Sequence, residues 1–175
     1  PKSLELNLLA FGITLLVAIP LGIVAAVYRN SLIDRGVMLV TTVGYGLPNF
    51  FLGLILIFVF SMRLKWLPSS STGSWKHLVL PVFTLVTFES AILARFVRSS
   101  MLEVLNQPYM RTAKSKGLRS RTVLRRHALP NIAIPVVTVL GLRLVSYIGG
   151  SVITENVFAW PGVGRLLVHA VRNRD

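Results

Sequence analysis

The chain has 175 residues, of which 53% are hydrophobic and only 14% charged, and its formal net charge is +13. Soluble domains carry about 25% charged residues, so this chain has too few polar groups to cover a globule in water. The absence of cysteine excludes a disulfide framework and a thiolate metal site. These bounds predict an integral membrane protein.

Four apolar blocks are long enough to cross a bilayer, because a hydrocarbon core of about 30 Å needs about 20 residues of helix. They cover, in chain order, residues 4–28, 37–62, 77–96 and 129–154. In the second block, Gly44, Gly46 and Pro48 should loosen or kink the helix. We therefore expect an all-α polytopic transmembrane helix bundle, with about four spans in one domain over the whole chain.

The last part of the chain, residues 155–175, does not read as another span. The run after Trp160 is too short and too charged to cross, and it predicts a short helix lying at the outer membrane interface. The chain enters its first apolar block almost at once and stops soon after the last one. We therefore expect it to be a fragment of a longer protein.

Basic residues are concentrated between the third and fourth blocks. Residues 95–126 hold nine Lys or Arg and one acid, Glu103, so the positive-inside rule places this stretch in the cytoplasm. Alternation then places the turn at residues 29–36 inside and the loop at residues 63–76 outside, although that loop itself carries three cations. The tryptophans all fall in outer segments, where an interfacial aromatic belt would place them: Trp66, Trp75 and Trp160.

A loop at residues 97–128 contains the signals of a short helix. Asn106 suits an N-cap, Pro108 a first turn, and Gly117 the position just past the end. A helix of about two to three turns is not stable alone in water, so it needs a neighbouring surface. A nucleic-acid site would place aromatic side chains among the cations, and only Tyr109 is there. A loop that serves topology alone needs charge but no caps, so a docking helix is favoured.

Two ionisable residues lie about halfway along membrane blocks, Glu89 in the third and Arg143 in the fourth. A charge at the bilayer centre costs about 2.5–3.5 kcal/mol and is a functional candidate by default. The two helices run in opposite directions, so the side chains could form a pair, or one of them could face an aqueous path. The alternative is that Arg143 contacts backbone carbonyls near Gly141 and only packs.

Three further residues are candidates for a translocation path. Pro48 and Asn49 interrupt the second block and could expose backbone polar groups, with a plain kink as the alternative. Ser146 lies beside Gly149 and Gly150 in the outer half of the fourth block. Small residues also let helices approach closely, so packing is the favoured role there.

The basic loop resembles the cytoplasmic motif of ABC-importer permeases, Glu-Ala-Ala-x3-Gly-x9-Ile-x-Leu-Pro. The matching positions are Ala113, Gly117, Leu129 and Pro130. The departing positions are Arg111, Thr112 and His127. These departures are similar to the oligopeptide, dipeptide and nickel branch, whose loops resemble YxRTAxxKGL. Further stretches resemble that branch, among them PNFFLGLILI, LARFVRSSMLEVL and GGSVITENVFAWPGVGRLL.

The resemblance implies a type I permease-like subunit of an ATP-driven importer in the bacterial inner membrane, with one more span at each end. A second permease, cytoplasmic ATPase subunits that hold ATP and Mg²⁺, and an external solute-binding protein are the implied partners. The implied ATPase-coupling residues are Tyr109, Arg111, Thr112, Ala113, Lys114, Ser115, Lys116, Gly117, Leu129 and Pro130. Ala113 and Ser115 would allow close seating on the ATPase, and Gly117 a sharp turn. Arg111 stands where the consensus has a carboxylate, so a salt bridge there would be reversed or absent.

The sequence contains neither a phosphate-binding Gly-x4-Gly-Lys loop nor a Gly-x-Ser-x-Gly elbow. We therefore expect no enzyme activity and no cofactor bound by this chain, with ATP hydrolysis by partners. Peptides are the expected solute, with nickel, glutathione or another small solute as alternatives. An ion channel or a membrane scaffold is the alternative of a different class. Membrane lipid is an expected partner and nucleic acid is not.

Overall fold

The computed structural model describes residues 2–70 and 73–173, except for the side chains of residues 114, 146, 148–150 and 173. The described chain is helical without strands. In order, the elements are α1 (Lys2–Val27), α2 (Leu32–Gly46), α3 (Asn49–Leu56), the π-helix η1 (Ile57–Arg63), α4 (Lys76–Leu105), α5 (Pro108–Ser115), α6 (Ser120–Val123), the π-helix η2 (Leu124–Ala128), α7 (Leu129–Val157) and α8 (Val163–Asn173).

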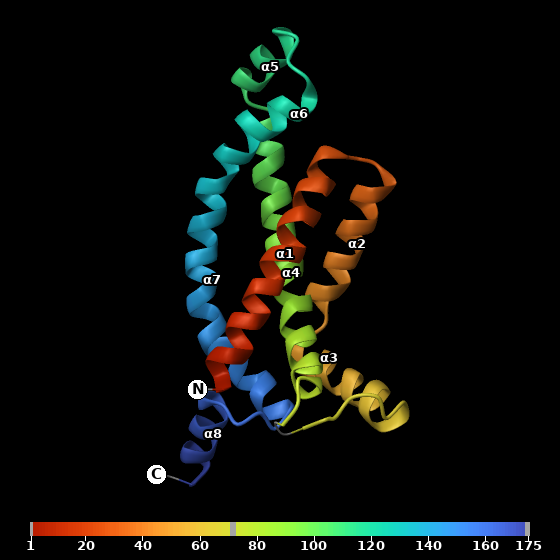
Figure 1. The fold of residues 1–175 in the computed structure, drawn as a ribbon, viewed down its shortest axis with the longest axis vertical. Coiled ribbons are helices and arrows are strands. Elements are labelled where there is room, and N and C mark those ends of the chain that lie inside the picture. The colour runs from red at the N-terminus through yellow and green to blue at the C-terminus, as the bar shows by residue number, and fades with distance from the viewer. Residues whose placement is uncertain (1, 71–72, 174–175) are drawn as a thin grey trace.

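The long helices lie side by side, and α4 contacts α1, α2 and α7 (Figure 1). The short helices α5 and α6 cap one end of this bundle, which we call the α5 end; α3 and α8 lie at the opposite end. Within the described residues, α1, α4 and the helical run from Ser120 to Val145 are long and apolar enough to cross a membrane. The pair of α2 with α3–η1 makes a fourth span if it is counted as one. The predicted all-α membrane bundle is confirmed.

The second apolar block is broken rather than loosened. Its two halves, Leu32–Gly46 and Asn49–Arg63, are bent by 96°. Both connecting residues are extended: Leu47 has φ −88° and ψ 121°, and Pro48 has φ −58° and ψ 138°. A residue before proline avoids the helical region, so Leu47 ends α2 and the chain turns. The sequence predicted a loosened or kinked helix, and the 96° bend is a larger change of direction.

Small residues at every fourth position bring α1 against α4, the most extensive helix contact of the described chain. This small-residue stripe is buried along its length and consists of Ala10, Thr14, Ala18, Gly22 and Ala26. At its closest point, a Cβ on Gly22 would lie 2.6 Å from the carbonyl oxygen of Ala94 and 2.7 Å from Cβ of Val97. In lipid, helix association depends on such close packing because the tails are as apolar as the side chains.

Two of the three tryptophans are exposed, as residues of an interfacial aromatic belt would be. Trp66 and Trp75 are 66% and 69% exposed and belong to the connection between η1 and α4. The same prediction is wrong for Trp160, which is only 2% exposed. Its ring packs in a core cluster with Leu6 and Tyr147, and its Nε1–H donates to the carbonyl of Lys2 at 3.1 Å. Trp160 therefore packs inside the protein and anchors the start of α1.

Candidate functional site

The basic loop folds into the short helix that its sequence signals indicate. Helix α5 begins at Pro108 and ends at Ser115, just before Gly117. The N-cap prediction for Asn106 is wrong, because α4 continues to Leu105 and Asn106 terminates it instead. The backbone N–H of Asn106 donates to the carbonyl of Leu102 at 3.2 Å.

Helix α5 is fixed to the bundle along one face. Met110 and Ala113 are 0% and 7% exposed and belong to a core cluster with Met101, Val123 and Ala128, which lie on α4, α6 and η2. Ala113 therefore packs inside its own chain, and of the two small residues expected at an ATPase surface only Ser115 is exposed. The other face of α5 is open, with Tyr109, Arg111, Thr112 and Ser115 exposed.

The turn after α5 requires glycine for its backbone conformation. Gly117 has φ +75°, and a Cβ added there would meet nothing within 4 Å. Space is therefore not the constraint; the left-handed conformation is, and it disfavours every residue with a side chain.

The remaining predicted coupling residues lie around this turn. Leu129 is half-buried and packs against the same core cluster as Met110. The neighbouring Pro130 is exposed in the first turn of α7. The side chain of Lys114 lies outside the described residues, and Lys116 is exposed.

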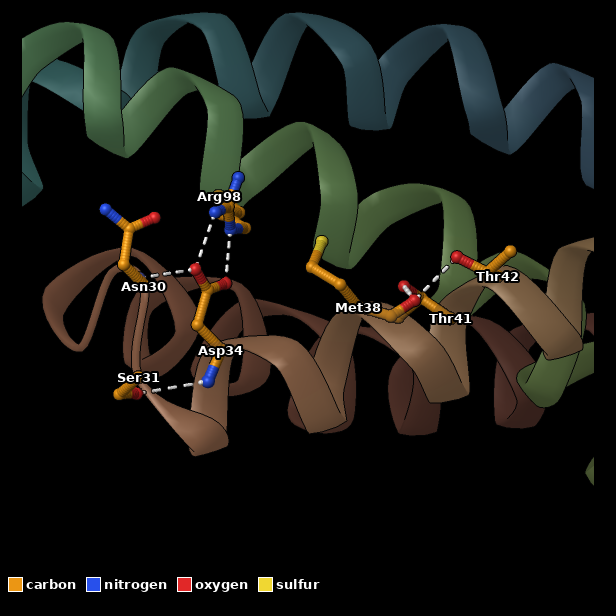
Figure 2. A network of polar contacts seen from close by, with 7 residues as sticks. All are labelled: Asn30, Ser31, Asp34, Met38, Thr41, Thr42 and Arg98. Carbon is orange, nitrogen blue, oxygen red and sulfur yellow. Dashed lines mark hydrogen bonds and ion pairs between the residues drawn. The ribbon is translucent and has the colours of Figure 1, made fainter.

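Near the α5 end, an ion pair fixes α2 to α4. Arg98 donates two hydrogen bonds to Asp34, from Nε to Oδ1 at 2.6 Å and from Nη2 to Oδ2 at 2.7 Å (Figure 2). Asp34 also accepts from the backbone N–H of Asn30 at 2.9 Å. Its own N–H donates to the N-cap hydroxyl of Ser31 at 3.3 Å. Ser31 and Asp34 have the spacing of a capping box, a sequence signal that could have identified Asp34 as structural.

We expect Arg98→Lys to lower the stability of the full-length protein by about 1–2 kcal/mol, because lysine cannot reproduce the two-pronged contact with Asp34. The matched control is Arg35→Lys in the same region of α2, since Arg35 is exposed. Thermal unfolding of both variants in detergent measures the difference. Equal midpoints for the two would contradict the role of the pair.

The intramembrane charges Glu89 and Arg143 lie together. Glu89 Oε2 is 3.7 Å from Arg143 Nη1, with side chains 15% and 33% exposed. The distance is that of an ion pair and is longer than a hydrogen bond. The structure thus has the arrangement that the pairing hypothesis requires, from α4 and α7.

Beside this pair lies a hollow of about 490 Å³, which we call the arginine hollow, lined by Tyr45, Phe88, Ile92, Arg95 and Arg143. Its wall includes a stacked aromatic pair, with the rings of Tyr45 and Phe88 5.7 Å apart between centroids. Nη2 of Arg95 donates to the hydroxyl of Thr42 at 2.7 Å. Helices α2, α4 and α7 all contribute to the hollow.

Two other predicted path residues, Pro48 and Asn49, do not join this hollow. Pro48 and Asn49 lie at the break between α2 and α3, where Pro48 is exposed and Asn49 is half-buried. Neither residue lines the arginine hollow. The side chain of Ser146 lies outside the described residues.

At the opposite end of the bundle, a buried carboxylate that the sequence reasoning missed holds the start of α8. Glu155 is 0% exposed. Its Oε2 accepts from the backbone N–H groups of Gly164 at 2.8 Å and Arg165 at 3.2 Å. Its Oε1 accepts from the hydroxyl of Ser151 at 3.2 Å. Free N–H groups and the dipole at a helix N-terminus favour an anion. The Pro161-Gly162 pair before an apolar run was the available signal.

This network extends to the first turns of α1. The side-chain amide of Asn7 donates to the Ser151 hydroxyl at 3.2 Å. The hydroxyl of Ser3 accepts from the backbone N–H of Val163 at 2.7 Å. Polar contacts therefore join α1, α7 and α8 at one place.

Comparison with known proteins identifies the family and several relatives. The family model described as "Binding-protein-dependent transport system inner membrane component" matches residues 18–175. The oligopeptide transport system permease protein AppB of Bacillus subtilis (strain 168) is 42% identical, over 100% of this chain and 58% of that protein. The glutathione transport system permease protein GsiC of Escherichia coli (strain K12) is 48% identical, over 88% of this chain and 50% of that protein.

Comparison with solved structures identifies the fold. An inward-facing conformation of the MetNI methionine ABC transporter has a TM-score of 0.77 and 18% sequence identity, and the match covers 97% of this chain and 76% of the MetNI chain. This similarity supports the arrangement of the helices. The chain spans 58% and 50% of the length of the two relatives named above.

Proposed function

The chain belongs to the family of binding-protein-dependent transport system inner membrane components, and on this premise we propose that it is part of a permease subunit of an ATP-driven importer of peptides. Two relatives are named as permeases for oligopeptide and glutathione transport, which supports a solute built from amino acids. The family is one of transport components, so the chain is a multi-pass membrane protein rather than an enzyme. The bacterial inner membrane is its proposed location.

The observation that carries the proposal is the seating of α5. One face of this helix is buried through Met110 and Ala113, while Tyr109, Arg111 and Ser115 are exposed at the end of the bundle. A helix attached in this way transmits force to the bundle. An isolated helix of this length would unfold instead. The exposed face, the turn at Gly117 and the exposed Lys116 are the proposed docking surface for an ATPase subunit.

The route of coupling follows from the core cluster under α5. Met110 shares that cluster with Met101 of α4 and with Ala128, directly before α7. Helices α4 and α7 carry Glu89 and Arg143 farther along. Closure of the ATPases would shift α5, and this shift would therefore displace the two helices that hold the intramembrane charges. ATP and Mg²⁺ belong to the ATPase partners, a second permease completes the path, and an external solute-binding protein delivers the solute. Leu129 and Pro130 start the helix that receives the shift.

The test uses the absence of cysteine from these 175 residues, with any cysteine elsewhere in the protein replaced by serine. In the full-length protein, Ser115→Cys in inverted membrane vesicles should crosslink to co-expressed ATPase subunits, and the yield should change when ATP is added. Ser70→Cys is the matched control, because Ser70 is exposed in the connection before α4 and should give no such crosslink. Free labelling of the Ser115→Cys variant without any crosslink would favour a channel or a scaffold. A channel would then conduct ions without any ATPase.

A further inference from the structure

The arginine hollow holds more positive charge than the chain neutralises. Arg143 has Glu89 at 3.7 Å, whereas Arg95 donates to a neutral hydroxyl, that of Thr42. Among the ion pairs of the described residues, none includes Arg95. The hollow is therefore lined by two guanidinium groups, of which only Arg143 has a carboxylate beside it, at 3.7 Å.

The two guanidinium groups lie at different depths. Arg143 lies about halfway along its apolar block, where an arginine faces water or another polar group rather than lipid, because insertion of its charge costs about 2.5–3.5 kcal/mol. Arg95 lies six residues after Glu89 on α4, about 9 Å along the helix axis toward the α5 end. Arg95 is exposed, so its guanidinium group is open to an anion that enters the hollow.

We propose that Arg95 and Arg143 form a transient binding site for a carboxylate, contributed by a solute that passes through the arginine hollow. Guanidinium groups bind carboxylates through paired, charge-assisted hydrogen bonds. The volume of about 490 Å³ lies within the range of small-molecule sites. The Tyr45–Phe88 pair supplies an apolar wall beside the charges, as a peptide terminus with its last side chain would need.

The same geometry allows the bound solute carboxylate to leave the site. A solute carboxylate at Arg143 competes with Glu89, whose Oε2 is already 3.7 Å away. Departure of the solute restores the internal pair, so Arg143 is never left without an anion. This inference rests on the proposed import of peptides, because it assigns the solute's carboxylate to one place on the path.

The experiment measures anion preference without requiring transport. The full-length protein, assembled with its transporter partners in liposomes, carries Ile92→Cys, because Ile92 lines the arginine hollow. These 175 residues contain no cysteine, and any cysteine elsewhere in the protein is replaced by serine. The probes are a sulfonate-bearing and a trimethylammonium-bearing methanethiosulfonate, each normalised to its rate with free 2-mercaptoethanol. We expect the anionic reagent to react about tenfold faster, because a cleft lined by one sign of charge concentrates the opposite ion.

Variants and competitors identify the source of the preference. Arg95→Gln with Arg143→Gln should abolish it, and Arg95→Lys with Arg143→Lys should retain it. Trialanine should slow the reaction of the thiol introduced by Ile92→Cys, and trialanine amide should not. Ser70→Cys, exposed in the connection before α4 and outside the hollow, is the control and should show a weaker preference for the anionic reagent. Equal normalised rates for the two reagents with the Ile92→Cys variant would overturn the proposal.

Two other outcomes are also decisive. If neither reagent reaches the thiol of the Ile92→Cys variant, the hollow is closed to water, and the solute site is refuted. ATP-driven uptake of trialanine or glutathione by the same liposomes tests the proposed function separately. Uptake without anion preference refutes only the site, and anion preference without uptake refutes only the proposed import.

Discussion

Gly22→Ala is expected to destabilise the full-length protein by about 2 kcal/mol or more, the cost of overpacking against atoms that cannot move aside. A Cβ at this position would lie 2.6 Å from the backbone oxygen of Ala94 and 2.7 Å from Cβ of Val97. Neither atom is the end of a flexible side chain, so α1 would have to separate from α4. Thermal unfolding in detergent, followed by the loss of monodisperse protein, measures the effect.

The same helix offers a matched control. Gly12→Ala adds a methyl group that meets nothing within 4 Å, and alanine is about 0.5–1 kcal/mol better than glycine inside a helix. Gly12→Ala should therefore leave the unfolding midpoint unchanged or raise it. If both variants behaved alike, the close approach of α1 and α4 at Gly22 would be refuted.

Removal of the Glu155 carboxylate should have a comparable effect at the other end of the bundle. Glu155→Ala leaves the N–H groups of Gly164 and Arg165 without their side-chain acceptor. It also leaves the Ser151 hydroxyl without its acceptor. Unsatisfied buried groups cost about 1–3 kcal/mol each, so we expect the unfolding midpoint to fall clearly and α8 to detach from α7.

Glu155→Gln distinguishes charge from shape. The glutamine oxygen replaces only one of the two acceptors, so this variant should lie between Glu155→Ala and the native protein. Glu103→Gln is the control, since Glu103 is exposed on α4. Protease sensitivity of the α8 segment should be lowest in the native protein, higher in Glu155→Gln and highest in Glu155→Ala. A native-like Glu155→Ala would show that the carboxylate does not hold α8.

The helices were predictable because apolar length and local signals determine them. The apolar blocks predicted α1, α4 and α7 within a few residues at most ends, and Pro108 with Gly117 predicted α5. The break at Leu47–Pro48 was underestimated, because a proline signal gives the place of a bend but not its angle. Asn106 was misassigned because asparagine suits both ends of a helix. In the structure α4 continues to Leu105, so Asn106 ends α4 instead of starting α5.

The packing between helices could not be predicted from short stretches of sequence, because the contacting residues lie far apart in the chain. The burial of Trp160 follows from contact with Lys2 at the far end of the sequence. The small-residue stripe on α1 was readable as a spacing of four, but its partner helix was not. Glu89 and Arg143 were open to prediction from helix direction alone. Arg95 and Tyr45 were not, because the hollow requires the placement of α2 against α4.

The contacts of Ser3 and Asn7 join the first turns of the chain to Val163 and Ser151. Ser3 and Asn7 are synthesised long before their partners, so α1 leaves the translocon while α7 and α8 have not yet been made. Until more than 140 residues have followed, these two side chains must be satisfied by water, headgroups or a membrane chaperone. The start of α1 therefore reaches its final polar contacts only after α8 has been synthesised.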